Sequence, residues 1–483
     1  MMPTNEKMSK QSKVILFILI LGNFLCLISE TVMNVALPSI ISTLHVTTST
    51  AQWLSTGYML IIGISVPVSA FLIQRFTLRQ LFITAMCLYV IGSLIGYITP
   101  FFSLLFIGRM IQALGTGIVL PLVMSTMLTL VPVSIRGTVM GIFNVAILFA
   151  PAIGPVISGL IIQYYSWRIV FLGLLIAAVL ILIIAVFKLH NVSETSKPTI
   201  HIPSVILSTV GFGGVVYGFS TAGEASGWGN PIVWITLVVG VLALAFFVRQ
   251  QTKLSSPMIS MKPFTSSVFS RAMFLMFLIM MIQFSMMLIL PLYFQTAAGL
   301  TPLGTGFLML PGGITLAFTA MIGGRLFDKV GFKPLIIIGL LLIMIVLSLF
   351  TQISNETATT TAAILYAAFT IGVGLSIGPV MTLGLNQVPK QLHAHGSAIS
   401  NTINQVSGAI GPALYTSIMA AASQHYIQHT NEANKTMLNI QSMTQGIHTV
   451  YRAAIVFAAV CFILALTLKK KDQYLETDND DLS

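Results

Sequence analysis

The sequence predicts an all-α integral membrane protein with fourteen transmembrane helices, in which two six-helix halves flank two central helices. Three observations predict this class: the composition, a succession of fourteen apolar runs, and an internal repeat. Of 483 residues, 56% are hydrophobic and only 7% are charged, whereas about a quarter of a soluble domain is charged. So few charges cannot cover a surface in water, which excludes a soluble enzyme. The high apolar content also excludes a disordered chain, because disordered chains are poor in apolar residues.

Each apolar run is long enough for a helix to cross a bilayer, which takes about 20 residues. Helices are expected because lipid offers no hydrogen-bond partner to an open backbone, and the runs do not alternate as barrel strands do. The expected spans are 14–37, 51–73, 80–99, 103–130, 137–162, 168–188, 202–221, 231–249, 270–297, 303–326, 334–351, 360–385, 396–421 and 449–468. They divide the chain into a cytoplasmic tail (1–13), a first half (14–190), two central helices (202–249), a second half (270–468) and an acidic cytoplasmic tail (469–483).

The basic residues predict that both termini lie in the cytoplasm. With this orientation, nineteen of the 23 basic residues fall on the cytoplasmic side, and Arg168, Lys435 and Arg452 fall outside. Such a bias is the signal that orients membrane helices. The net charge of +11 therefore reflects topology, and we expect no nucleic-acid partner.

An internal repeat relates the two halves at an offset of about 254 residues. One pair of segments surrounds Arg79 and Lys333, and a second pair surrounds Gly154-Pro155 and Gly411-Pro412. Repeated halves are typical of secondary transporters, whose substrate site lies between the repeats near the middle of the membrane.

Four motifs carry a resemblance to a known family. The segment Gly324–Lys333 reads G-x-L-x-D-x-x-G-x-K in full, and the first span contains Glu30-Thr31-x2-Asn34-Val35-Ala36-Leu37-Pro38. The fourth span carries Arg109, Gln112, Gly115 and Gly117, and the fifth carries Gly141, Gly154, Pro155 and Gly159. The sequence resembles the major facilitator superfamily, specifically its fourteen-helix drug:proton antiporter branch of multidrug efflux proteins. It departs from that pattern at Gln74, Thr77, Ala150 and Ser158, and it has Glu30 where Asp is more usual.

The resemblance implies a protein that is not an enzyme: a multi-pass antiporter of the plasma membrane, and we expect a bacterial one. It would export amphipathic toxic compounds by alternating access, with the proton gradient as its energy source and no cofactor or metal. The protons, the drugs and the bilayer are then the expected partners, and we expect a monomer. The resemblance also implies that the motif of the fifth span limits leak.

Glu30 is the only acidic residue of the chain inside an expected span. A charge there is costly, so such a residue usually faces a cavity and works in it. We therefore predict that Glu30 carries the coupled proton, against the alternative of a carboxyl that only packs against a neighbouring helix.

Arg109 is the only basic residue well inside a span. Unpaired arginine would be expensive there, so we expect bonds to backbone carbonyls, Gln112 or Glu30. A role in proton coupling or water access is favoured over pure anchoring.

Other polar residues of the spans are candidates for the substrate cavity. Asn23 and Asn34 share the helical side of Glu30, and Asn401, Asn404 and Gln405 cluster at i, i+3, i+4. The full candidate set is Asn23, Asn34, Gln52, Tyr58, Gln112, Asn144, Asn401, Asn404 and Gln405. Packing between helices is the competing interpretation for each.

The remaining candidates concern gating. We expect the segment Gly324–Lys333 to be a loop at the membrane surface, in which Asp328 latches one conformation of the two halves. Its motif positions are Gly324, Arg325, Asp328, Lys329, Gly331 and Lys333. Gly154-Pro155 is expected to form a bend where the halves meet.

Two other functions stay open. One is a transporter of the same fold for a single physiological substrate, such as a lipid, a bile compound or a metabolite. The other is a membrane sensor or scaffold that transports nothing, against which Glu30 argues. No phosphate loop of the G-x4-G-K-[ST] type occurs in the chain, which argues against an ATP-driven pump.

Overall fold

The computed structural model describes residues 8–131, 136–191, 201–223, 227–254, 257–296, 298–353, 357–389, 392–430 and 435–468. Fourteen α-helices occur in these ranges, and each predicted span coincides with one of them. They are α1 (Lys10–Leu44), α2 (Thr48–Arg75), α3 (Leu78–Ile98), α4 (Phe102–Leu130), α5 (Arg136–Tyr164), α6 (Trp167–Lys188), α7 (Ile202–Thr221), α8 (Pro231–Lys253), α9 (Ser267–Thr296), α10 (Pro302–Val330), α11 (Phe332–Phe350), α12 (Thr359–Asn386), α13 (His393–His429) and α14 (Lys435–Thr467). Two short 3-10 turns, η2 (Gly227–Gly229) and η3 (Lys262–Thr265), precede α8 and α9.

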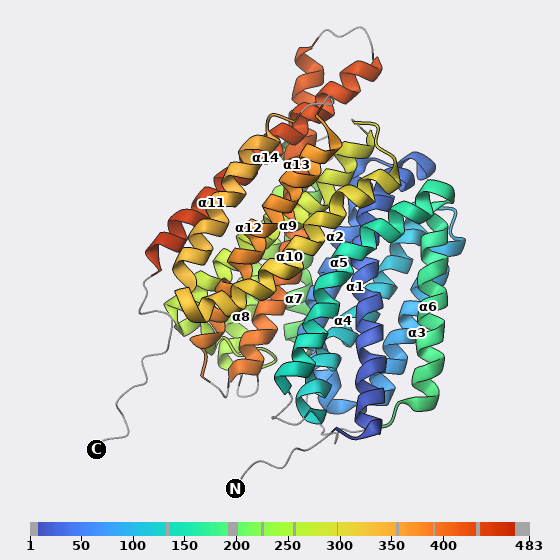
Figure 1. Ribbon diagram of the computed structural model, residues 1–483, viewed down its shortest axis with the longest axis vertical. Coiled ribbons are helices and arrows are strands. Elements are labelled where there is room, and N and C mark those ends of the chain that lie inside the picture. Colours follow the sequence, from blue (N-terminus) through green and yellow to red (C-terminus); the bar gives the residue numbers. More distant parts are fainter. Residues whose placement is uncertain are drawn as a thin grey trace.

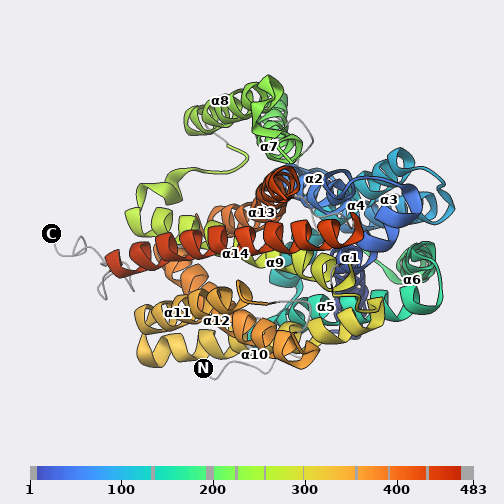
Figure 2. The ribbon, with the colours of Figure 1, turned by 90° about the horizontal axis from the view of Figure 1, so that it is seen from above.

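The helices form two bundles side by side, α1–α6 and α9–α14, with α7 and α8 set off to one side (Figures 1 and 2). Helix α7 packs against α2 and α13, and α8 packs mainly on α7. Across the two bundles the principal contacts are α5 with α10 and α2 with α13.

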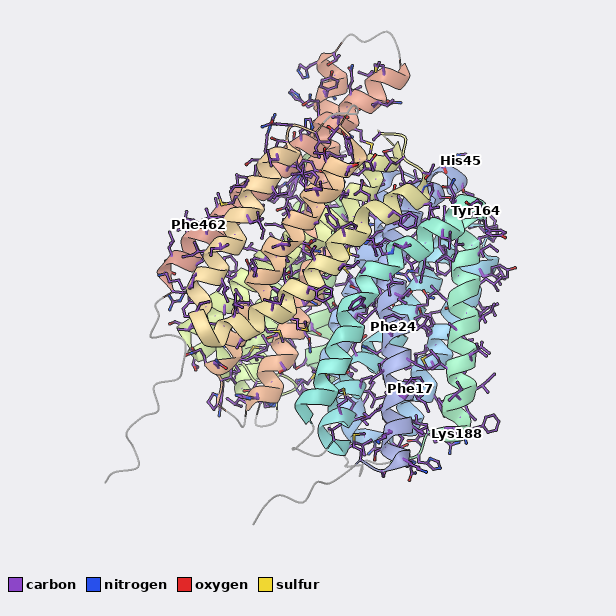
Figure 3. The ribbon with its side chains drawn as sticks, viewed as in Figure 1. Phe17, Phe24, His45, Tyr164, Lys188 and Phe462 are labelled. Atoms are coloured by element: carbon purple, nitrogen blue, oxygen red, sulfur yellow. The ribbon has the colours of Figure 1, made fainter. Side chains whose placement is uncertain are left out.

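All the helices run between two faces of the molecule. Lys188 lies at the face where α1 begins, whereas His45 and Tyr164 lie at the other (Figure 3). We call the first the basic face, because Lys10, Arg75 and Lys253 also mark helix ends there. The second is called the opposite face.

Eleven of the helices contain a described stretch long and apolar enough to cross a membrane, by length and composition alone. Helices α2, α5 and α13 do not reach that criterion within the described residues. In α5 the described stretch, Ala152–Tyr164, is apolar but short. All three helices take part in the contact between the two halves.

Small residues bring equivalent helices together in both halves. An added Cβ on Gly108 would lie 3.0 Å from the carbonyl oxygen of Gly92, where α3 crosses α4. In the second half, a Cβ on Gly372 would lie 2.7 Å from the carbonyl oxygen of Gly339, where α11 crosses α12. The same backbone approach thus recurs in both bundles, as an internal repeat requires.

Two connections differ from the sequence-based expectation. Gly324–Lys333 is not a loop: α10 continues to Val330, α11 begins at Phe332, and Gly331 alone joins them with φ 78°. A side chain would be strained at that φ, which explains glycine. The segment 422–448, which lies between the last two expected spans, consists in its described part of extensions of α13 and α14 that protrude from the opposite face (Figure 1).

Candidate functional site

The polar stripe of α1 is buried, as its spacing predicts. Asn23, Glu30 and Asn34 are 1%, 7% and 3% exposed. Asn34 Oδ1 accepts a bond from Ser55 Oγ at 3.3 Å, and Asn23 Oδ1 has no partner. Unlike Arg109, Glu30 has no hydrogen bond or ion pair recorded in the described part of the chain. Its carboxyl group is therefore buried without a direct bond in the described structure, but close enough to Arg109 for the two groups to interact electrostatically.

Arg109 on α4 is fully buried and held from several directions. Its Nη1 donates to Ser29 Oγ at 2.8 Å and to Gln112 Oε1 at 2.9 Å. Its Nε and Nη2 approach the carbonyl oxygens of Leu54 and Ser29, both at 3.4 Å. The guanidinium also lies 3.9 Å from the centre of the Tyr58 ring, a favourable cation–π arrangement.

The Arg109 cluster extends through the first four helices. Gln112 Nε2 donates to Ser93 Oγ at 2.7 Å, and the hydroxyls of Tyr58 and Thr116 are 2.7 Å apart. Arg109 therefore bonds to Ser29, the residue before Glu30, and not to the carboxyl itself. Tyr58 and Gln112 are fully buried here, so their place in a substrate cavity stays a prediction.

The two halves meet along α2 and α13, from the opposite face to mid-depth. Gln52 and Thr416 hydrogen-bond across the halves. Farther in, Met59 packs against Gly408, and Gln405 against Gly63.

Beyond Gly63, toward the basic face, the candidate cavity residues become more accessible. Asn401 is exposed and Asn404 is partly exposed. Gln405 is 6% exposed, and its Nε2 has no hydrogen-bond partner. The cluster on α13 therefore runs from the closed contact into accessible space, as a cavity wall would.

A second contact between the halves joins α5 to α10 and follows the same pattern. An added Cβ on Gly306 would lie 2.6 Å from the carbonyl oxygen of Pro155, and one on Gly159 would overlap Pro302. Gln295 Nε2 also donates to the carbonyl oxygen of Val35 at 3.2 Å, joining α9 to α1. The halves are thus closed at the opposite face.

The motif of the fifth span touches both α1 and α10. Gly154 faces Thr31, the residue after Glu30, and an added Cβ would overlap its hydroxyl. Helix α5 is continuous through Pro155, so the expected bend stays a prediction. Gly141 and Asn144 lie on α5 too, but their side chains are outside the described set.

The gating motif is described only at its end. The side chains of Arg325, Asp328 and Lys329, and the surroundings of Gly324, are outside the described set, so the latch stays a prediction. Lys333 Nζ donates to the carbonyl oxygens of Leu466 and Leu468 at 3.0 and 2.8 Å. Its repeat counterpart Arg79 donates to the carbonyl oxygen of Val186 at 2.8 Å. Both residues cap the C-terminal end of the last helix in their half. A cation is favourable there because the C-terminal end of a helix carries a partial negative charge.

Comparison with known proteins follows from this architecture. The family model "Major Facilitator Superfamily" matches residues 19–412. The chain belongs to the Major Facilitator Superfamily. It is a multi-pass transporter of the bacterial plasma membrane and not an enzyme.

Relatives cover nearly the whole chain. Lincomycin resistance protein LmrB of Bacillus subtilis (strain 168) is 40% identical over 97% of this chain and 98% of its own. Lincomycin resistance protein LmrB of Listeria monocytogenes is 38% identical over 93% and 95%. A multidrug resistance protein B homolog of Mycobacterium tuberculosis is 24% identical over 84% and 76%.

Solved structures share the fold at low identity. A bacterial homolog of the human lysosomal transporter Spinster has a TM-score of 0.72 at 15% identity, covering 97% of this chain and 99% of that one. A peptide transporter POT has a TM-score of 0.67 at 17% identity, covering 93% and 94%. These likenesses establish the fold alone.

Proposed function

We propose that this protein is a proton-coupled multidrug efflux transporter that exports amphipathic toxic compounds by alternating access. The observation that carries the proposal is Glu30, a buried carboxyl group with no ion pair recorded in the described structure. Charge is costly at such a site, and a proton removes it. Relatives named for lincomycin and multidrug resistance support drugs as the exported class.

The proposed topology has fourteen transmembrane helices with both ends of the chain in the cytoplasm. The basic face is then cytoplasmic, and the structure is closed on the outside and inward-facing. In this state Glu30 lies one residue from Thr31, where α1 meets Gly154 of α5. We propose that Glu30 releases its proton to the inside as a drug enters, and takes up another after the halves rock outward.

The experiment reconstitutes the full chain in proteoliposomes that enclose a pH-sensitive dye. Adding lincomycin or an amphipathic cation should move protons in the wild type, and Glu30→Gln should abolish that movement because an amide cannot exchange the proton. Glu224→Gln changes an acid in a predicted outer connection and is the matched control. Two results would refute proton coupling through this residue: proton movement that does not depend on the drug, or proton movement in Glu30→Gln equal to that of the wild type.

The test also separates the alternative of one physiological substrate. A multidrug exporter should give proton movement with several unrelated amphipathic compounds, and a dedicated transporter with only one chemical class. Cells that overproduce the protein should show the same breadth in their resistance profile.

A further inference from the structure

Helix α8 stands apart from the second half and leaves a crevice facing α13. The α7–α8 pair reaches the bundle mainly through α7, and the chain returns from α8 to α9 through residues 257–266 (Figure 2). Gln251 ties that return to the pair, because its Nε2 donates to Ser204 Oγ at 2.7 Å and its Oε1 accepts from Ile259 N at 3.3 Å. The crevice is therefore a built feature of the fold.

The deeper part of the crevice is an apolar cavity of about 220 Å³. Phe247 and Val248 of α8 line one side, and Ile399 and Ile403 of α13 line the other. Thr402 also lines it, and its buried hydroxyl has no hydrogen-bond partner. A hydrocarbon chain is the ligand that such a wall favours, because burying it removes apolar surface from water.

The mouth of the crevice is a cavity of about 540 Å³ with both polar and apolar lining residues, and Met261 lines both cavities. Lys262 and His395 supply its cationic and donor groups, and the lining includes no acidic residue. Ser260 N donates to His395 Nδ1 at 3.3 Å, which leaves the proton of a neutral imidazole on Nε2. Lys262 is exposed at the mouth, so its ammonium group is accessible to an anion.

The two cavities are stacked along the membrane normal. On α13, His395 precedes Ile399 by one helical turn, about 6 Å, and on α8 Val248 lies one turn farther from the basic face than Gln251. The polar mouth therefore lies at the basic face and the apolar part inside the membrane. This is the profile of a lipid with a charged head and an acyl chain.

We propose that the crevice between α8 and α13 binds an anionic phospholipid of the inner leaflet, with its phosphate at Lys262 and His395 and an acyl chain beside Val248 and Ile399. The location in the inner leaflet rests on the proposed topology. Cationic pockets between helices at the cytoplasmic side hold such head groups. The site assigns a role to α7 and α8, because a bound lipid fills the gap that separates α8 from the transport bundle.

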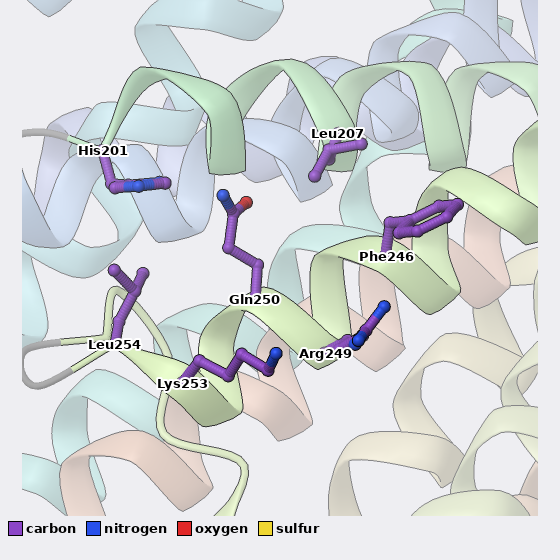
Figure 4. A pocket seen from close by; sticks show the side chains of 7 residues that line it. All are labelled: His201, Leu207, Phe246, Arg249, Gln250, Lys253 and Leu254. Carbon is purple, nitrogen blue, oxygen red and sulfur yellow. The ribbon is translucent and has the colours of Figure 1, made fainter.

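A second basic groove serves as an internal control. His201, Arg249 and Lys253 line a cavity of about 450 Å³ (Figure 4). Its α8 residues are 246, 249, 250 and 253, whereas the crevice uses 244, 247, 248, 251 and 252, and these sets lie on largely opposite sides of the helix. Leu254, just beyond the end of α8, borders both cavities. Lys253 therefore offers a cation at the same face of the membrane but outside the crevice.

The experiment uses the full chain in nanodiscs of phosphatidylcholine that contain a small fraction of phosphatidylglycerol with a diazirine on one acyl chain. Nanodiscs expose both leaflets, so the result does not depend on orientation. After illumination, mass spectrometry should find adducts concentrated at residues 244–248 and 399–403. Val248→Trp should remove them, whereas Leu242→Trp, at an exposed position on the side of α8 that carries Arg249 and Lys253, should not. Lys262→Gln should lower labelling by roughly fivefold, the effect of one cation near a lipid head group, and Lys253→Gln should lower it less.

The proposal would be overturned by adducts spread evenly over the outward side of α8, or by equal labelling with a phosphatidylcholine probe. Equal losses of labelling in the two tryptophan variants would also overturn it. So would displacement of the probe by excess lincomycin, which would make the crevice a drug site. The Glu30→Gln variant should label like the wild type. Failure of proton coupling and failure of lipid binding are therefore distinguishable.

Discussion

At the residue scale, Glu30 and Arg109, the acidic and basic side chains buried in the described part of the first half, have opposite surroundings. Arg109 bonds to Ser29, Gln112 and Leu54 and stacks on Tyr58. These contacts offset the free-energy cost of burying its charge. Glu30 has no comparable partner in the described structure. Arg109 is thus held in place by its bonds to α1, α2 and α4, and we propose Glu30 as the group whose charge changes during transport.

Arg109→Lys should therefore stop transport while Arg168→Lys does not. Lysine keeps the charge but cannot fork to Ser29 and Gln112, and each lost bond to a charged group costs about 1.5–3 kcal/mol. Arg168 is a matched control at the opposite face, because it lies 4.3 Å from the Trp167 ring and bonds to the Thr99 carbonyl oxygen. Drug-driven proton movement and the thermal midpoint are measured for both. Equal transport losses would show that Arg109 acts only through stability.

The sequence predicts Glu30 and Arg109 because charge is so scarce in the spans, but it does not predict their partners. Ser29, Ser93 and Thr416 carry small hydroxyls of a kind that occurs on almost every helix here. Many such groups only bond to their own helix, and Ser93 also does so, at 2.7 Å from the Tyr89 carbonyl oxygen. Nothing in the spacing distinguishes a hydroxyl that reaches another helix.

At the element scale, glycines set how closely α5 and α10 approach. Gly306→Val would place a β-carbon against the backbone of Pro155 and Val156. Such overpacking should destabilise the closed contact by about 1–3 kcal/mol. The outside should then open more often, so a cysteine at Gln52 should react faster with an impermeant maleimide. Transport should fall at the same time.

The control is Gly173→Val on α6, where an added Cβ meets nothing within 4 Å. It should change neither maleimide reactivity nor transport. If both valine variants react alike, α5–α10 packing does not govern the outer opening.

The sequence predicts a helix correctly where the thickness of the bilayer sets the length of its apolar run. It predicts the ends of helices less well where charged residues interrupt that run. The polar ends of α10 and α11 look like a loop because Arg325, Asp328, Lys329 and Lys333 lie within nine residues. Helix α10 instead continues to Val330, and Gly331 alone makes the turn to α11. The extensions of α13 and α14 were missed for a related reason, because helices outside lipid need no apolar run.

At the scale of the whole molecule, the proposed alternating access requires the contact between the halves to break. The observed closure uses Gln52 with Thr416 and Pro155 with Gly306, all on the side away from the basic face. The contact contains close approaches of glycines and a few hydrogen bonds, together with apolar residues of both halves that belong to one hydrophobic cluster. Rocking must therefore also separate apolar residues of α1 and α2 from those of α9 and α13.

A reversible lock across that contact should stop the cycle. Gln52→Cys with Thr416→Cys places two thiols where the native side chains hydrogen-bond, in a background without Cys26, Cys87 and Cys461. Oxidation should join the halves at the opposite face and abolish drug-driven proton movement, and a reductant should restore it. Each single cysteine variant should be indifferent to oxidation. Because the lock leaves the basic face free, lincomycin should still bind to the oxidised protein from that side. A cross-linked protein that continues to transport would show that the halves do not separate at α2 and α13, and the alternating-access mechanism proposed here would be wrong.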